Sequence, residues 1–323
     1  MQALVCHQWG GPELLQVQEL PAPQPGPGQI SIRVRAASLN FPDLLMIQNK
    51  YQVQPALPFV PGAEIAGEIL AVGEGVQGLQ SGMSVAALCG TGGFAEQCVV
   101  DAAMAMPLPP GTPMPLAASL ALAFGTSWHA LRDRAALQAG ETVLVLGAAG
   151  GVGLAAVGIA KAIGARVLAA VSSEAKAEVC RQHGADEVVL YEQQDLRQAV
   201  KAFSAHGVDV VFDAVGGKLA ESAFRSIAWR GRYLVIGFAS GEIPALPWNL
   251  PLLKGASIVG VFWGEFARRE PRRNAEGIGE LLSWIQSGKL RPEISRVYSL
   301  ADAAQAFVDM AERRVVGKVV IAP

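Results

Sequence analysis

The sequence has few of the features that mark several large classes of protein. It contains four cysteines at irregular spacings with no C-x-x-C pair, which excludes a disulfide framework and a structural zinc cluster. Lys and Arg number 26 against 28 Asp and Glu, so the net charge of −2 lacks the positive excess that phosphate-backbone binding requires. We therefore expect a protein of the reducing cytoplasm that does not bind nucleic acid.

Long apolar runs that are able to span a membrane are also lacking. Two uncharged stretches, residues 102–131 and 142–160, are interrupted by five prolines and five glycines respectively, which break a spanning helix. The first residues show no basic leader followed by an apolar run and a cleavage site. We expect no export and no membrane partner.

The chain does have enough apolar material for two domains, with 323 residues of which 51% are hydrophobic. Its first hundred residues alternate short β-rich runs with Gly and Pro, which predicts a partly open β-barrel. From about Pro115, apolar strands alternate with glycine turns and helix-length stretches, which is typical of a parallel sheet wound by helices. The expected strands here cover residues 142–146, 166–171, 187–190, 208–212, 232–236 and 257–261, and the expected helices 152–163, 174–183 and 195–205.

The last part of the chain contains an Arg-rich segment, two amphipathic helices near 278–287 and 301–313, and a strand at 318–321. These elements are too few for a third domain, so we expect them to return to the first. The predicted fold class is α/β, with a first domain at residues 1–120, an inserted doubly wound parallel sheet at 121–265, and a return at 266–323.

A glycine-rich loop follows the strand at 142–146 and opens a helix. Set against the dinucleotide fingerprint G-x-G-x-x-G, it has Ala148, Gly150 and Gly153, so the first glycine is replaced. Free N–H groups at the helix start would bind a pyrophosphate. The loop predicts a bound dinucleotide, with Gly150, Gly151, Val152 and Gly153 as its contacts.

The type of dinucleotide is indicated about 20 residues further on. Ser172, Ser173 and Lys176 stand where an NAD-binding protein carries an acidic residue, and hydroxyls beside an ammonium suit a 2′-phosphate. This favours NADPH over NADH. The alternative is that one serine merely caps the next helix and Lys176 is a solvated charge, and the nearby Glu174 keeps that alternative open.

Several ordered motifs give the chain a resemblance to the medium-chain dehydrogenase/reductase superfamily, within its zinc-free quinone oxidoreductase branch. They cover residues 38–51, 57–76, 92–100, 124–131, 147–157, 208–217 and 231–241. The resemblance implies a GroES-like β domain built from both chain ends, with an inserted Rossmann domain. That architecture agrees with the division drawn from the sequence pattern.

The resemblance also bears on metal binding and on the catalytic residues. Zinc-dependent relatives carry Cys or Asp where this chain has Asn40, and G-H-E where it has Gly62-Ala63-Glu64, so no metal is expected. Asn40 and Tyr51 correspond to residues that line the nicotinamide and substrate cleft. Their structural alternatives are a turn residue and a half-buried aromatic, and Leu45 replaces a second tyrosine found in some relatives.

Further cofactor contacts follow from the resemblance or from their place after parallel strands. The residues expected to contact the cofactor, beyond the glycine loop and the Ser172–Lys176 segment, are Thr126, Tyr191, Gly237, Phe238, Phe262 and Trp263. Phe262 and Trp263 have a subunit contact as their alternative, and we expect a homodimer formed through the strand at 257–263.

The predicted function is zinc-independent, NADPH-dependent reduction of a quinone or an α,β-unsaturated carbonyl. One alternative is an enoyl-thioester (enoyl-CoA) reductase, in which Arg268, Arg269, Arg272 and Arg273 would bind the phosphates of coenzyme A, unless they form a solvated surface loop. A second alternative is a low-turnover NADPH-binding protein that acts as a redox sensor or structural protein.

Overall fold

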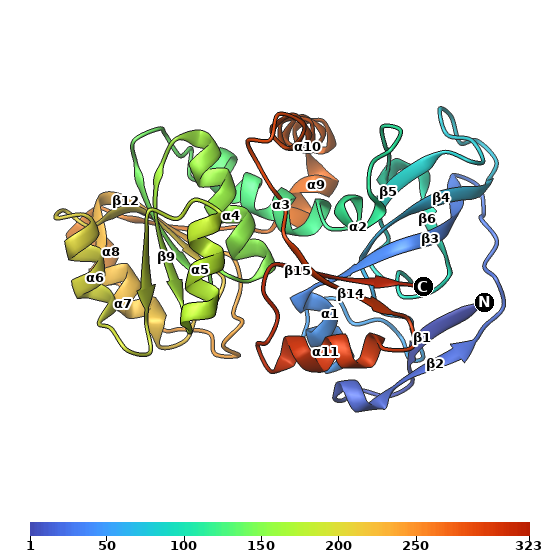
Figure 1. Cartoon of the computed structure of the whole chain (residues 1–323), viewed down its shortest axis with the longest axis horizontal. Coiled ribbons are helices and arrows are strands. Elements are labelled where there is room, and N and C mark those ends of the chain that lie inside the picture. Colours follow the sequence, from blue (N-terminus) through green and yellow to red (C-terminus); the bar gives the residue numbers. More distant parts are fainter. The chain divides into compact units, whose positions relative to one another are not determined.

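The computed structural model describes residues 1–323 and divides into two compact units (Figure 1). The first unit comprises Met1–Ala121 and Ile294–Pro323, and the second comprises Leu122–Glu293. The second unit is therefore an insertion between the two ends of the first. No helix combines the length and the apolar character that a membrane crossing needs.

The first unit is built on a largely antiparallel sheet in the order β14-β15-β3-β4-β5-β7, with β6 also pairing with β3 and a separate β1-β2 pair. Its strands are β1 (Gln2–Cys6), β2 (Leu15–Glu19), β3 (Gln29–Leu39), β4 (Glu64–Val72), β5 (Ser84–Leu88), β6 (Gln97–Asp101), β7 (Ala105–Pro107), β14 (Ile294–Ser299) and β15 (Lys318–Ala322). Its helices are η1 (Pro12–Leu14), α1 (Phe41–Ile47), η2 (Ala102–Met104), α2 (Met114–Ala117) and α11 (Ala303–Ala311).

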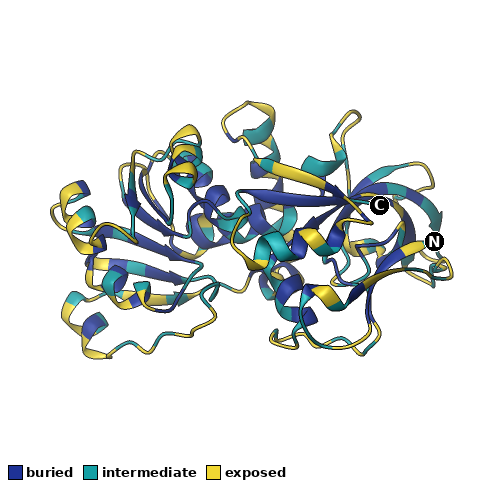
Figure 2. Cartoon of the chain, turned by 60° about the horizontal axis from the view of Figure 1, so that its bottom comes forward, coloured by how far each residue is buried: buried dark blue, intermediate teal, exposed yellow.

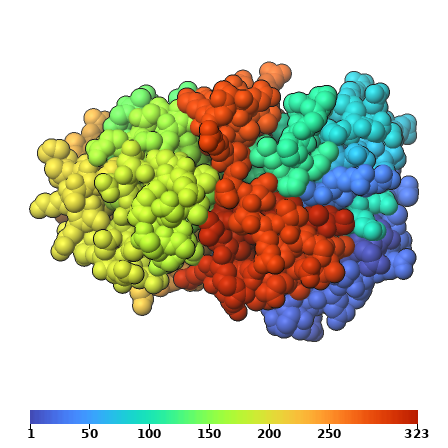
Figure 3. All heavy atoms as spheres, in the orientation of Figure 1, coloured from blue at the N-terminus to red at the C-terminus, as the bar shows by residue number.

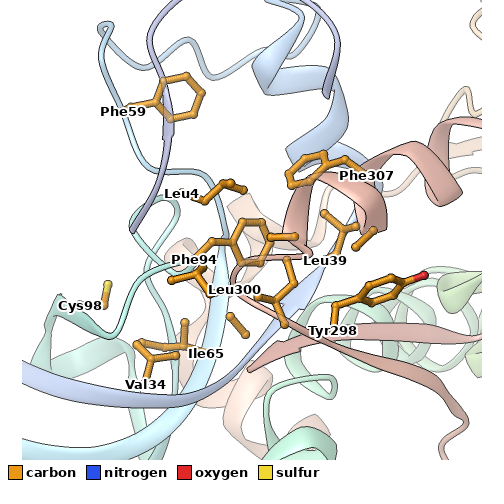
Figure 4. Packing of buried hydrophobic residues seen from close by; sticks show 14 of the residues in the cluster. Leu4, Val34, Leu39, Phe59, Ile65, Phe94, Cys98, Tyr298, Leu300 and Phe307 are labelled. Carbon is orange, nitrogen blue, oxygen red and sulfur yellow. The ribbon is translucent and has the colours of Figure 1, made fainter. Parts of the chain in front are cut away.

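The core of the first unit joins the two ends of the chain (Figure 4). Leu4 of β1 and Leu39 of β3 are buried with Phe94 and with Phe307 of α11. The rings of Phe94 and Phe307 meet edge to face, with centroids 5.7 Å apart. Apolar contact between residues so far apart in the chain fixes the carboxyl-terminal segment, red in Figure 3, against the blue amino-terminal strands.

The second unit has a six-stranded sheet in the order β10-β9-β8-β11-β12-β13, and every pairing in it is parallel. Its strands are β8 (Thr142–Leu146), β9 (Arg166–Val171), β10 (Glu187–Leu190), β11 (Val208–Asp213), β12 (Ile227–Val235) and β13 (Ser257–Gly260). Its helices are α3 (Ala121–Trp128), the π-helical η3 (His129–Arg134), α4 (Gly151–Ile163), α5 (Glu174–Gln182), α6 (Leu196–Phe203), α7 (Leu219–Arg225), α8 (Asn249–Lys254), α9 (Trp263–Arg269) and α10 (Pro271–Gln286).

This strand order confirms the predicted doubly wound sheet. The central strand β8 is buried along its whole length, as the continuous apolar run TVLVL requires of a strand covered on both faces. Figure 2 shows the strands of this sheet in the colour of buried residues and the outward helix faces in that of exposed ones. The chain order reverses at β8, between β9 and β11, and that is where such sheets bind ligands.

The return to the first unit comes later than predicted. We expected it at residue 266, but the first unit resumes only at Ile294. Helix α10 stays in the second unit because Trp128 Nε1 donates to Glu280 Oε2 at 2.6 Å, while Gly277 leaves room for the Trp128 ring. The Arg-rich segment is helical in α9 and α10, so its interpretation as a loop was wrong.

Candidate functional site

The glycine loop between β8 and α4 has the tight turn that a dinucleotide fingerprint needs, but at a different glycine. Gly147, directly before Ala148, has a φ of +68°, which glycine adopts without strain. The turn glycine is therefore present one position earlier than the fingerprint alignment suggested. A Cβ at Gly153 would lie 2.2 Å from the Gly147 carbonyl oxygen, so only glycine allows this approach of helix to strand.

The first turn of α4 is arranged to receive an anion. Gly150 is its N-cap and supplies no side-chain hydrogen bond, so the leading N–H groups of this 13-residue helix have no side-chain cap. Ser127 of α3 donates to the Val152 carbonyl oxygen at 2.8 Å and so fixes α3, which also carries Thr126, to this turn. These residues fit the pyrophosphate of a dinucleotide, as the sequence predicted.

The carboxyl ends of β9 and β10 bring together the residues expected at a 2′-phosphate. Ser172 follows β9 and Tyr191 follows β10, and the Tyr191 N–H donates to the Val171 carbonyl oxygen at 3.2 Å. Lys176 of α5 reaches back to this edge, where its Nζ donates to Ser172 Oγ at 3.3 Å. A hydroxyl and an ammonium thus lie beside Tyr191 at the outer part of the sheet.

Two alternatives for this segment are tested by the contacts of α5. Ser173 is the N-cap residue, but its side chain makes no capping hydrogen bond. Glu174 is the acidic residue that left the alternative to a 2′-phosphate site open. It accepts a hydrogen bond from Arg181 Nη1 at 2.6 Å on the exposed side of α5. The geometry therefore favours the phosphate interpretation.

Asp213 at the end of β11 organises the next loop and was missed by the sequence analysis. Its Oδ1 accepts from the N–H groups of Val215 and Gly216, both at 2.8 Å, and its Oδ2 accepts from the Tyr233 hydroxyl at 2.5 Å. Burial and the Asp213 carboxylate together raise the pKa of Tyr233, so this hydroxyl stays protonated. The V-D-V-V-F-D pattern at 208–213 was the available signal, because it ends a buried strand on a carboxylate.

The remaining cofactor candidates occupy different environments. Gly237 follows β12 and donates to the Asp213 carbonyl oxygen at 3.3 Å, and the Phe238 ring lies against Gly216. Phe262 precedes α9 and is 59% exposed.

Trp263 is buried within the second unit. Its indole packs on Gly125, and its Nε1 donates to Asn274 Oδ1 at 2.9 Å. The side chain is therefore covered by residues of its own chain.

In the first unit, Asn40 belongs to a buried polar cluster at one end of the sheet. Lys318 Nζ donates to Asn40 Oδ1 at 2.6 Å and to Glu64 Oε1 at 3.0 Å. The Asn40 Nδ2 group donates to the same Glu64 oxygen at 3.0 Å and to the Ser38 carbonyl oxygen at 3.1 Å. Both N–H bonds of the Asn40 amide are therefore directed at protein acceptors.

Asp43 lies under this cluster, in the first turn of α1. Its two carboxylate oxygens accept from the N–H groups of Asn40 at 2.8 Å and Gly62 at 3.2 Å. Complete burial raises the pKa of Asp43 to about 7, against the lowering effects of the Asn40 N–H and of Lys318. Asp43 therefore titrates near neutral pH.

Tyr51 is half-buried beyond the end of α1 and packs against the first-unit core. Burial raises the pKa of its hydroxyl, and the Asp43 carboxylate adds to the rise, so Tyr51 keeps its proton at neutral pH. No protein group forms a hydrogen bond with this hydroxyl. Of the two residues expected at the reaction site, Tyr51 is the one with a donor to offer.

The positions that would hold zinc in metal-dependent relatives serve other purposes here. No three His, Cys, Asp or Glu side chains are grouped as metal ligands. Glu64, the one carboxylate left from the zinc-site motif, is ion-paired with Lys318. The sequence analysis missed Lys318 because a lysine that opens a strand is ordinarily solvated.

Comparison with known proteins identifies relatives over the whole chain. Residues 26–110 match the family described as alcohol dehydrogenase GroES-like domain, and residues 151–279 match the family described as zinc-binding dehydrogenase. A quinone oxidoreductase-like protein 2 homolog of Nematostella vectensis is 37% identical, with 99% of this chain and 88% of the relative covered.

Solved structures give the same picture. The quinone oxidoreductase of Thermus thermophilus, solved also in complex with NADPH, is 36% identical and superposes with a TM-score of 0.86. The quinone oxidoreductase of Escherichia coli, in complex with NADPH, is 28% identical with a TM-score of 0.92. Both alignments cover 100% of each chain. The predicted combination of a GroES-like and a Rossmann domain is confirmed.

Proposed function

Because this chain belongs to the quinone oxidoreductase branch of the medium-chain dehydrogenase/reductase superfamily, we propose that it reduces a quinone or an α,β-unsaturated carbonyl with NADPH and without zinc. The observation that carries the proposal is the cofactor cradle of the second unit. A glycine-only contact at Gly153, an uncapped helix start at Gly150 and the Lys176 ammonium beside Ser172 together match a dinucleotide with a 2′-phosphate.

The residues of the cradle have separate roles in this proposal. The N–H groups of Gly151 and Val152 bind the pyrophosphate, while Ser172, Lys176 and Tyr191 bind the 2′-phosphate. Bound NADPH supplies a hydride to the acceptor. Asp213 holds the start of the loop at 215–217 in place through its two backbone hydrogen bonds.

The Tyr51 hydroxyl serves as the hydrogen-bond donor to the acceptor oxygen. Hydride addition to a conjugated carbonyl places negative charge on that oxygen, and a positioned donor stabilises it. The hydroxyl suits this task because it is protonated at neutral pH and not engaged by the protein. Zinc is not needed in this scheme, because the Tyr51 hydroxyl takes the place of a Lewis acid at the acceptor oxygen.

The enoyl-thioester alternative receives less support from the structure. Arg268 and Arg269 pair with Glu265, and Arg273 pairs with Glu270 and Asp133. Three of the four arginines suggested for the phosphates of coenzyme A therefore already have carboxylate partners. A quinone or a simple enone remains the better substrate class.

An acceptor screen tests the proposal. NADPH consumption is measured with a simple quinone, an enone and an enoyl-CoA, for the wild type, Tyr51→Phe and the control Tyr298→Phe. Tyr298 is matched because its hydroxyl donates to Asp309, a contact that the proposed reaction does not use. We expect Tyr51→Phe to slow the enone by about 10²-fold and the quinone only severalfold, since a hydroquinone product is protonated by water.

Two outcomes of the screen would contradict the proposal. If NADPH binds but is not consumed in the presence of any of the acceptors, the redox-sensor alternative is favoured. Equal rates for Tyr51→Phe and the wild type on every acceptor would remove Tyr51 from the chemistry and leave catalysis to proximity.

The proposed enzyme is a homodimer through the edge of its parallel sheet. Strand β13 pairs only with β12, and large apolar side chains around this edge are exposed in the single chain. They are Trp229, Ile243, Trp248, Leu252, Leu253, Ile258 and Phe262. A second copy of the chain would cover both the free backbone groups and this apolar surface.

Light scattering across a concentration series tests the dimer. We expect the wild type to be dimeric, Ile258→Lys to be monomeric, and Met104→Lys, which places the same charge at an exposed position of the first unit, to remain dimeric. A wild type that is monomeric at high micromolar concentration would contradict the dimer.

A further inference from the structure

A buried ion pair joins three strands at the end of the first-unit sheet from which α1 departs. Lys318 opens β15, Glu64 opens β4, and Asn40 directly follows β3. The register pairs Val319 with Leu39 and Ser38 with Glu64, so these chain positions lie at the same end of three neighbouring strands.

The pair is withdrawn from solvent. Lys318 is 3% exposed and Glu64 is 1% exposed. Burying two charges costs free energy that their attraction recovers only with good geometry, and an apolar pair of similar volume is often as stable. Stability alone therefore does not explain why this strand end carries an ion pair.

The ion pair fixes the orientation of the Asn40 amide. Together with the Ser38 carbonyl oxygen, Lys318 and Glu64 form hydrogen bonds with the oxygen and both N–H groups of the Asn40 amide, at 2.6 to 3.1 Å. The Asn40 side chain is thereby held in one orientation. It has no N–H left to donate to an acceptor oxygen, so its contribution is through geometry.

Asn40 also stands at the start of α1, the helix that leads to Tyr51. The Asn40 N–H donates to Asp43 in the first turn of α1, and the Lys50 N–H donates to the Leu45 carbonyl oxygen at 2.9 Å. Tyr51 is the next residue along the chain. Two backbone hydrogen bonds, one at the start of α1 and one just beyond its end, thus hold the helix that joins Asn40 to the segment that carries the Tyr51 hydroxyl.

We propose that Lys318 and Glu64 are positioning residues for the reductase reaction, fixing Asn40 and, through α1, the Tyr51 hydroxyl. The inference rests on the proposed function. It assigns Asn40 to this clamp of Lys318, Glu64 and Asn40 rather than to contact with the acceptor. The clamp sets the reactive geometry without taking part in proton or hydride transfer.

The test removes the ion pair as a unit. Lys318→Met alone leaves a buried carboxylate without its cation and is expected to unfold the protein, so the decisive variant is Lys318→Met with Glu64→Leu. We expect this variant to keep the NADPH affinity of the wild type but to have a lower thermal midpoint, because the buried Asn40 amide loses two hydrogen-bond partners. Its kcat with an enone should fall by about 10²-fold, the effect of displacing a catalytic group by about 1 Å.

Two further variants complete the design. Lys161→Met with Asp186→Asn removes an exposed ion pair of 2.8 Å in the second unit and is expected to leave kcat unchanged. Lys318→Met with Glu64→Gln removes both charges but keeps the size and an acceptor oxygen at position 64, and it decides the matter if the first double variant does not fold. We expect it to lower kcat severalfold while NADPH affinity stays unchanged.

The outcomes separate the inference from the proposed function. If either double variant folds and has the kcat of the wild type, the positioning role is overturned and the proposed function is left standing. If the wild type binds NADPH but reduces none of the acceptors, both the positioning role and the proposed function are overturned. A fall in stability and NADPH affinity with unchanged kcat per folded molecule would make the ion pair merely structural.

Discussion

Replacing Lys176 by alanine should remove most of the preference for NADPH over NADH. In the structure, Lys176 Nζ lies 3.3 Å from Ser172 Oγ at the carboxyl end of β9, and Tyr191 follows the neighbouring strand. A 2′-phosphate bound beside these groups would accept a charge-assisted hydrogen bond from the ammonium. NADH has a hydroxyl at that place and would lose little from the substitution.

The size of the effect follows from the kind of interaction that is lost. A hydrogen bond to a charged group contributes about 1.5–3 kcal/mol, which is roughly one to two decades in affinity. Glu174 does not offset the ammonium, because its carboxylate pairs with Arg181 at 2.6 Å. We therefore expect Lys176→Ala to raise the Kd for NADPH by about 10- to 100-fold and the Kd for NADH by less than about twofold.

Fluorescence titration of both cofactors against the wild type, Lys176→Ala and Lys201→Ala measures this preference. Lys201 is the control because it is an exposed lysine of α6 in the same unit. Equal weakening of both cofactors by Lys176→Ala would show that the ammonium acts on something other than the 2′-phosphate. A wild type that prefers NADH would refute the whole account of the Ser172–Lys176 segment.

Three other predictions concern the loop, the buried carboxylate and the metal. Gly153→Ala should abolish NADPH binding in titrations, because its Cβ would lie 2.2 Å from the Gly147 oxygen, whereas Gly279→Ala, with open space around it, should bind normally. Burial raises the pKa of Asp43 from 3.8 to about 7, so the stability contributed by its proton is fully present below pH 3.8 and is lost as pH rises through 7. Between pH 5 and 8 the free energy of unfolding, measured by chemical denaturation, should fall by on the order of 2 kcal/mol more in the wild type than in Asp43→Asn. The same pH dependence in both proteins would contradict this. Turnover should survive dialysis against a chelator, and one tightly bound zinc per chain whose removal abolishes activity would refute zinc independence.

The sequence by itself determined the organisation of the second unit. Strands such as β8 are continuous apolar runs because both of their faces are covered, and helices such as α4 and α5 follow within a few residues. These signals are local, so periodicity and glycine placement were enough to predict the parallel sheet, the phosphate loop and the Ser172–Lys176 segment. The short strands β1, β2, β7 and β14 were not predicted; β2 and β14 are mostly exposed, so they lack the continuous apolar run that marks a buried strand.

Only the tertiary structure decided how the polar residues of the first unit are used. Lys318 and Asn40 are 278 positions apart, and the hydrogen bond between them exists because β15 pairs with β3. The late return at Ile294 has the same cause, since Trp128 and Glu280, 152 positions apart, hold α10 in the second unit. A buried charge depends on the partner that the fold brings to it, and no stretch of sequence around either residue carries that information.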